Sequence, residues 1–178
     1  MPNGAYFWGL KIDDKVFVNK IVKVDRAVVE RIFKLTAGIP YYIYAVANKY
    51  KEVKNVEKAF VLEVLSRSGL IRNSVKNSLD NSLNRARGKT LLWNILKVLA
   101  KASLRLSEVS RAIYRSSAVT NNLLNRLSLV DLIEKNDGKF RFSDKVMGYY
   151  VAKIAFEFDL IADKKLLGEL VKELEQWK

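Results

Sequence analysis

The 178-residue sequence contains neither cysteine nor histidine, and these two absences exclude several classes of chemistry. Without cysteine the chain can form no disulfide and offers no thiolate as a nucleophile or metal ligand. Without histidine it lacks the commonest metal ligand and the commonest general base. The absence of cysteine, together with many lysine, isoleucine and valine residues, is also compatible with a thermophilic source.

Long apolar runs are missing as well. No run approaches the roughly 18 apolar residues of a membrane span. The apolar stretch at residues 5–10 is too short for a secretory signal sequence, and no basic residue precedes it. We therefore expect a protein that has no membrane partner and resides in the cytoplasm.

Short patterns that suggest catalysis fail on spacing or context. Gly88-Lys89-Thr90 resembles the end of a phosphate-binding loop, but that loop needs a glycine at position 83, which is Leu83. Asp13-Asp14 is an acidic pair at an expected hairpin tip, and neighbouring side chains in a strand point to opposite faces. Glu57 and Glu63 are not spaced to share a helical face. We therefore expect no catalytic residues, no metal and no cofactor, and a protein that is not an enzyme.

The chain carries a net charge of +13, and the excess is concentrated in one segment. Residues 72–141 contain 14 basic and 5 acidic side chains, a net charge of +9, whereas residues 1–71 have +5 and residues 142–178 have −1. A polyanion such as a nucleic acid is the natural partner of such a basic segment. A basic surface that only binds water and counterions is the alternative that charge alone leaves open.

The pattern of residues 89–130 predicts three helices. The first carries apolar residues on one face at the helical period. Ser107 is the expected N-cap of a short second helix whose Val109 and Ile113 face inward, and Ser117 is the expected N-cap of the third helix. The expected inward residues of the first helix are Leu91, Leu92, Ile95, Leu96 and Leu99, and those of the third are Val119, Leu123, Leu124, Leu127 and Val130.

A hairpin is expected directly after the third helix. Residues 132–135 and 139–142 alternate between apolar and polar side chains on either side of Asn136-Asp137-Gly138. An Asp-Gly pair between such segments is a strong signal for a tight β-hairpin. Three helices followed by a hairpin within about fifty residues is the layout of a winged helix-turn-helix, which we expect over residues 88–145.

The segment before the winged helix predicts a small hairpin and then helices. Strand propensity predicts a hairpin that pairs residues 6–12 with residues 15–18. A helix that begins after its N-cap Asp25 is expected to end at the break from Thr36 to Pro40. Further helices are expected over residues 41–50, after an N-cap at Asn55, and over residues 70–87.

Two helices are expected after the hairpin. Ser143 or Asp144 can cap the first, which runs to about residue 158, and the second is amphipathic over residues 160–177. The second helix can pack on its own core or on a second copy of the chain, which leaves a homodimer open. The expected fold is mostly α, with a hairpin and helical lid-like region over residues 1–87, a winged helix with a small β-hairpin wing over 88–145, and C-terminal helices over 146–178.

The winged helix offers candidate DNA contacts on its third helix, in the turn before that helix, and on its wing. Asparagine pairs well with adenine, and arginine with guanine or phosphate, so polar side chains facing away from the core of the third helix are candidate base readers. Basic side chains in the wing are candidate phosphate contacts, which carry no sequence information. The alternative is a winged helix that binds protein or packs on a neighbouring domain. The candidate DNA-binding residues are Arg111, Arg115, Ser117, Thr120, Asn121, Asn122, Asn125, Arg126, Lys135, Lys139 and Arg141.

Two stretches resemble one protein family. From Asp25 to Ile43 a helix runs into Thr36-Ala37-Gly38-Ile39-Pro40, which is similar to the lid segment of archaeal P-loop ATPases of the AAA+-related, signal-transduction type. Residues 82–144 resemble the C-terminal module of the same family. The resemblance covers about residues 20 to 145, and it implies that the turn from Gly38 to Pro40 lies near the nucleotide in a complete ATPase.

The sequence also departs from that family. It contains no Walker A loop and no acidic Walker B strand, and Ala37 stands where the family's turn usually has glycine. The resemblance therefore implies the C-terminal half of such an ATPase or a stand-alone descendant of one, and no nucleotide-binding residue can be carried over.

The sequence leaves three functions open. The leading hypothesis is a non-catalytic protein that binds double-stranded DNA through its winged helix, which the basic residues of 72–141 favour. The second is a regulatory module that packs on an ATPase core or another protein. An exposed patch around Trp8, Tyr41, Tyr42 and Tyr44 would favour it. The third is a fragment of an ATPase without its catalytic half.

Overall fold

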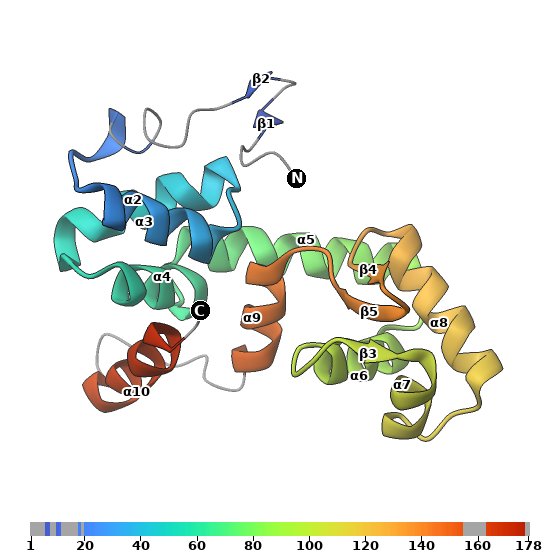
Figure 1. The fold of residues 1–178 in the computed structure, drawn as a ribbon. Helices are drawn as coiled ribbons and strands as arrows, with labels where there is room; N and C mark the ends of the chain where they lie inside the picture. The colour runs from blue at the N-terminus through green and yellow to red at the C-terminus, as the bar shows by residue number, and fades with distance from the viewer. Residues whose placement is uncertain (1–5, 8–9, 12–17, 19, 155–162, 177–178) are drawn as a thin grey trace. The chain divides into compact units, whose positions relative to one another are not determined.

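The computed structural model describes residues 6–7, 10–11, 18, 20–154 and 163–176 (Figure 1). The chain forms two compact units, the first made of residues 1–73 and 156–178 and the second of residues 74–155. The described residues are mostly helical, and the second unit contains a small three-stranded antiparallel sheet. This confirms the predicted fold class of a helical region, a winged helix and further helices.

The N-terminal strands pair differently from the prediction. β1 (Tyr6–Phe7) pairs antiparallel with β2 (Leu10–Lys11), so this pairing lies within residues 6–11. The predicted pairing of residues 6–12 with residues 15–18 is therefore wrong. The predicted turn at Asp13-Asp14 lies outside the described residues.

The strand expected over residues 15–18 is also wrong at its last residue, Val18. Val18 and Ile21 are helical, and the Val22 N–H donates to the Val18 carbonyl at 2.8 Å. The Val18 side chain is fully buried. β-branched residues prefer strands only weakly, and packing against the rest of the first unit overrides that preference.

The first unit is built on α2 (Arg26–Thr36), α3 (Pro40–Val53) and α4 (Val56–Leu65). The predicted break between α2 and α3 is confirmed, since Ala37 and Gly38 have φ angles of 54° and 73° and α3 begins with proline. Glycine adopts positive φ without strain, and proline at the first helical position gives up no helical hydrogen bond.

Polar contacts stabilise both ends of α4. The predicted N-cap is confirmed, because the Asn55 side-chain oxygen accepts the Lys58 N–H at 2.7 Å. At the other end, the buried Glu63 carboxylate accepts the N–H of Leu70, the first residue of α5 (Leu70–Ala86), at 2.8 Å. Burial raises the pKa of the Glu63 carboxyl, and the bonds from backbone N–H groups act against that rise. Gly69 lies so close to the α4 backbone that a Cβ there would clash with it.

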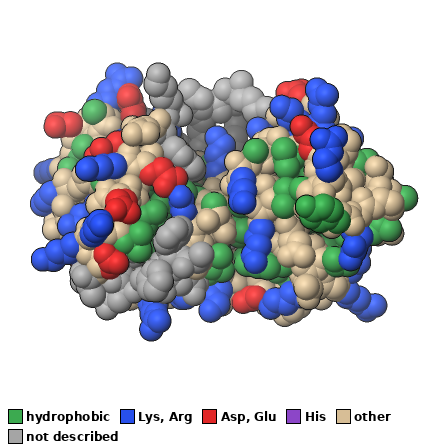
Figure 2. Space-filling model, turned by 90° about the horizontal axis from the view of Figure 1, so that it is seen from below, with side chains coloured by type: hydrophobic (Ala, Val, Ile, Leu, Met, Phe, Trp, Pro, Cys, Tyr) green, Lys and Arg blue, Asp and Glu red, His purple; other side chains and the backbone are tan. Residues whose placement is uncertain are grey.

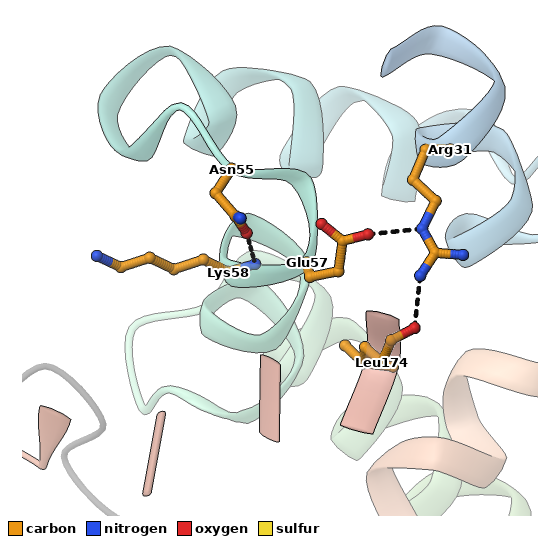
Figure 3. Close-up of polar contacts among 5 residues, drawn as sticks. All are labelled: Arg31, Asn55, Glu57, Lys58 and Leu174. Atoms are coloured by element: carbon orange, nitrogen blue, oxygen red, sulfur yellow. Dashed lines mark hydrogen bonds and ion pairs between the residues drawn. The ribbon is translucent and has the colours of Figure 1, made fainter. Parts of the chain in front are cut away.

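Arg31 of α2 contacts both α4 and α10 (Lys164–Glu175) (Figure 3). Its Nε donates to the Glu57 carboxylate at 2.6 Å, and Nη2 donates to the Leu174 carbonyl. The Arg31 and Glu57 side chains are mostly buried, so bulk salt screens this pair weakly. Through these two contacts Arg31 links three helices of the first unit.

α10 packs on its own core, which is one of the two alternatives left open by the sequence. Leu167, Leu170 and Leu174 are buried, and α10 contacts α4. The helix begins at Lys164, later than expected, because the Asp163 side chain caps it by accepting the Leu166 N–H at 3.0 Å. The predicted helical residues 160–162 and 177 lie outside the described residues.

The second unit is a winged helix. Residues 74–86 of α5 belong to this unit, whereas the sequence placed the division at Gly88. The sheet order is β3-β5-β4, and every pair is antiparallel. The elements are α6 (Lys89–Leu99), β3 (Leu104–Arg105), α7 (Leu106–Ala112), α8 (Ser117–Leu129), β4 (Ile133–Asn136), β5 (Lys139–Phe142) and α9 (Lys145–Lys153).

The predicted hairpin is confirmed, although its first strand covers residues 133–136 and not residues 132–135. Asp137 and Gly138 have φ angles of 49° and 76°, the positive values that a tight two-residue turn between twisted strands requires. Asn136 lies opposite Lys139 at the turn. The side chains of β5 alternate, with Phe140 and Phe142 buried and Lys139 and Arg141 exposed.

The start of α7 differs from the prediction. Leu104 pairs with Phe140, so the segment between the first two helices of the winged helix, for which no strand was predicted, is the third strand of the sheet. α7 begins at Leu106, and the predicted N-cap at Ser107 is wrong. The Glu108 carboxylate accepts the Arg105 N–H at 2.6 Å, which stabilises the helix start without a serine cap.

The inward residues of α6 largely follow the prediction. Leu92, Ile95, Leu96 and Leu99 are buried, while Leu91 is only half-buried. Asp144 is the N-cap of α9, where its side chain accepts the N–H groups of the second and third helical residues. Residues 155–158, predicted to continue α9, lie outside the described residues.

Candidate nucleic-acid interface

α8 separates its leucines from its asparagines, as the sequence predicted. The helical period places the two kinds of side chain on opposite faces. The leucines pack into the core, and the neighbouring helix α6 contacts this buried face. Buried residues are Leu123, Leu124 and Leu127, and exposed residues are Asn121, Asn122 and Asn125.

The first turn of α8 contains two corrections. Ser116, not Ser117, is the N-cap, and its side chain accepts the Val119 N–H at 3.4 Å. Val119, expected in the core, is 45% exposed, and Thr120, expected at the DNA interface, is 0% exposed. Thr120 lies on the leucine face of the helix, and its hydroxyl donates to the Ser116 carbonyl at 2.9 Å, so its burial leaves no unsatisfied donor. Ser117 is exposed.

Arg126 is the second residue, after Thr120, that was predicted to contact DNA and that the structure places away from the exposed face of α8. Its Nε donates to the Ala86 carbonyl at 2.9 Å, and Nη2 donates to the same oxygen. The guanidinium also lies beside Gly88, where an added Cβ would be 3.3 Å from Nη2. Gly88 has a φ angle of 91°, so the turn between α5 and α6 needs glycine for both conformation and space. Arg126 is therefore half-buried between α8 and this turn.

Replacing Arg126 with methionine should destabilise the protein by about 1.5–3 kcal/mol, because the Ala86 carbonyl loses a charged hydrogen-bond partner. Methionine keeps the length of the aliphatic stem and removes the donors. Arg111→Met is the matched control, since Arg111 is exposed, and it should change stability by no more than about 0.5 kcal/mol. Urea denaturation followed by circular dichroism measures both. Equal stability of the two variants would contradict the structural role of Arg126.

The end of α7 and the turn between α7 and α8 present basic and aromatic side chains to solvent. Arg111 and Arg115 are exposed, as predicted. Tyr114, which the sequence analysis did not select, is 86% exposed and has a φ angle of 54°. The Arg115 Nη1 donates to the Tyr114 carbonyl at 3.0 Å. An aromatic residue next to the polar break Arg115-Ser116-Ser117 is the sequence signal that could have identified Tyr114.

The wing exposes all of its predicted basic residues, and two of them have partners within the wing. Arg141 donates to the Glu134 carboxylate across the strands at 2.6 Å. The Lys135 ammonium lies 5.5 Å from the centre of the Phe140 ring. Lys139 is exposed at the end of the turn. Lys135 and Lys139 therefore keep their charge available to a ligand, whereas Arg141 is partly neutralised.

Most of the excess positive charge lies in the unit that contains the winged helix. Residues 74–155 contain 15 basic and 6 acidic residues, a net charge of +9. The residues of the first unit contain 17 basic and 13 acidic residues, a net charge of +4. In Figure 2, lysine and arginine side chains outnumber acidic ones over the winged-helix part, on the right of the view. Such a surface attracts polyanions.

No protein-family model matches the chain, and no curated protein matches it. Among the described residues, no helix combines the length and the apolarity needed to cross a membrane. Those same residues contain no group of acidic side chains suited to hold a metal ion. The exposed face of α8, together with the basic residues near it in the chain, is therefore the candidate binding surface.

Proposed function

We propose that this protein binds double-stranded DNA through its winged helix and does so without catalysis. α8 enters the major groove, and the β4–β5 hairpin lies along the phosphate backbone. In this arrangement the exposed residues of α8 face the base edges, and basic residues of the wing and of the α7–α8 turn face phosphates.

One observation carries the proposal. In the chain, the exposed asparagines of α8 are flanked by two groups of exposed cations, Arg111 and Arg115 before the helix and Lys135 and Lys139 in the wing after it. A surface that only serves solubility does not require amides on the exposed face of α8 and cations on both sides of it. Phosphate contacts hold a protein in register on the duplex, and amides in the groove then reach the bases.

The test is a fluorescence anisotropy titration of a labelled duplex of mixed sequence at low salt. We expect saturable association in the micromolar range or tighter, because nonspecific DNA binding already reaches this range at physiological salt. An unlabelled duplex should compete with the labelled one. Absence of association at about 50 mM salt would contradict the proposal.

A second candidate is an interaction module, and one observation favours it. Tyr41 and Tyr44 of α3 are exposed on the first unit, in the helix that follows the lid-like turn. Tyr42, which was expected to share this patch, is buried, and Trp8 lies outside the described residues. Under this candidate the tyrosines contact an ATPase core or another protein. If the duplex titration fails, this candidate becomes the leading one.

A further inference from the structure

The exposed face of α8 has a restricted chemistry. Ala118, Asn122, Asn125 and Leu129 recur at helical spacing and lie opposite the buried leucines. Asn121 and Val119 lie on the two sides of this row and are also exposed. The face therefore presents amide groups and small or branched apolar groups to whatever it contacts.

Positive charge is missing from that face. α8, which the structure describes in full, contains a single basic residue, Arg126. Its guanidinium donates to the Ala86 carbonyl and points to the turn at Gly88. The exposed face of α8 therefore has no side chain that can donate two hydrogen bonds from a cationic fork.

The two purines need different partners in the major groove. Adenine presents an acceptor at N7 and a donor at its N6 amino group, and an asparagine amide matches both. Guanine presents two acceptors, N7 and O6, which arginine and lysine match. Thymine adds a methyl group that packs against apolar side chains such as alanine. Asn122 and Asn125 fit adenine, and Ala118 and Val119 fit the thymine methyl group.

From this composition we infer that the winged helix prefers A·T-rich double-stranded DNA, which α8 reads through the major groove. The inference rests on the proposed function, and it names the class of DNA that the same site takes. The exposed cations Arg111, Lys135 and Lys139 lie outside α8 and supply phosphate contacts of no sequence preference. Arg115 precedes the helix, and its Nη1 is bonded to the Tyr114 carbonyl.

The experiment compares three duplexes that differ only in a central block of A·T, G·C or inosine·C pairs. An inosine·C pair has the major-groove edge of G·C, but lacks the guanine amino group, so its minor groove resembles that of A·T. We expect the A·T duplex to bind about ten- to a hundredfold more tightly than the other two, which should bind alike. Anisotropy titrations at one salt concentration measure the three affinities.

Variants locate the preference on α8. Asn125→Ala should reduce the ratio between the A·T and G·C affinities by about tenfold and leave binding to G·C nearly unchanged. Asn81→Ala is the matched control, because Asn81 is an exposed asparagine of α5, and it should keep the wild-type ratio.

Each other outcome has a defined meaning. Equal binding to all three duplexes overturns the inference and leaves the proposed function standing. Inosine·C binding as tightly as A·T overturns it as well, because the preference then comes from the minor groove or from DNA shape. A preference for G·C that disappears in Arg115→Ala also overturns it and identifies Arg115 as a guanine reader. Absence of binding to any duplex contradicts the proposed function itself.

Discussion

Raising the salt concentration from about 50 to 200 mM should weaken the binding of this protein to double-stranded DNA by about two orders of magnitude. The expected size of the effect follows from the exposed cations at the interface, Arg111, Arg115, Lys135 and Lys139. Each phosphate contact contributes roughly −0.9 to the slope of log affinity against log salt concentration. Arg141 is not counted because Glu134 already neutralises part of its charge. A smaller dependence would mean fewer phosphate contacts.

Charge-removing variants should make this slope shallower in proportion to the number of phosphate-binding side chains that they replace. Lys139→Gln should make it shallower by about one, and the double variant Arg111→Gln, Lys139→Gln by about two. Lys34→Gln is the control, because Lys34 is an exposed residue of α2 in the first unit and its replacement removes the same charge elsewhere. If the control lowers the slope as much as Lys139→Gln does, DNA binding follows net charge and has no defined site on the winged helix.

Gly69→Ala should destabilise the protein by about 1–3 kcal/mol or more. A Cβ on Gly69 would lie 2.2 Å from the Glu63 carbonyl oxygen and 2.9 Å from the Leu62 carbonyl oxygen. Both atoms belong to the backbone of α4, which cannot turn away as a flexible side chain could. Separating the two segments would also strain the bond from the Leu70 N–H to the Glu63 carboxylate. Alanine lowers the entropy of the unfolded chain, but that gain of about 0.4–1 kcal/mol is smaller than the clash.

A second glycine of the first unit provides the control for this prediction. Gly168 lies inside α10 and is exposed, and an added Cβ would meet no atom within 4 Å. Gly168→Ala should therefore stabilise the protein by about 0.5–1 kcal/mol, because alanine is the better helix former. Urea denaturation monitored by far-ultraviolet circular dichroism, which follows the loss of helix, measures both variants. Opposite signs are expected, and a Gly69→Ala variant as stable as the wild type would contradict the close packing at α4.

Structural features that depend only on residues close together in the sequence were predictable. The Asp137-Gly138 pair predicts the turn because these residues accept positive φ more easily than most. Asn55 and Asp144 were predicted as N-caps because a short side chain with an acceptor oxygen satisfies the first helical N–H groups. The leucines of α6 and α8 predict amphipathic helices through their spacing alone. These predictions needed no knowledge of distant contacts.

Two errors of the sequence analysis arose where contacts with distant parts of the chain decided the local structure. β3 has two residues, too few to show an alternating pattern, and it exists because it pairs with β5 more than thirty residues later in the chain. The strand propensity of Val18 predicted a strand, yet burial in the first unit holds it in a helix. In both cases tertiary contacts decided the local structure.

The sequence by itself determined that this chain forms a winged helix with a basic surface and asparagines on its third helix. Only the tertiary structure decided which side chains of α8 reach solvent. The sequence placed Val119 inside and Thr120 outside, but the leucine face sets the rotation of the helix, and Thr120 can be buried because its hydroxyl bonds to a carbonyl one turn earlier. Arg126 was expected to face DNA, and the Ala86 carbonyl holds it on the protein side. A charged group contacts whichever acceptor the fold brings within reach, and local sequence does not reveal that acceptor.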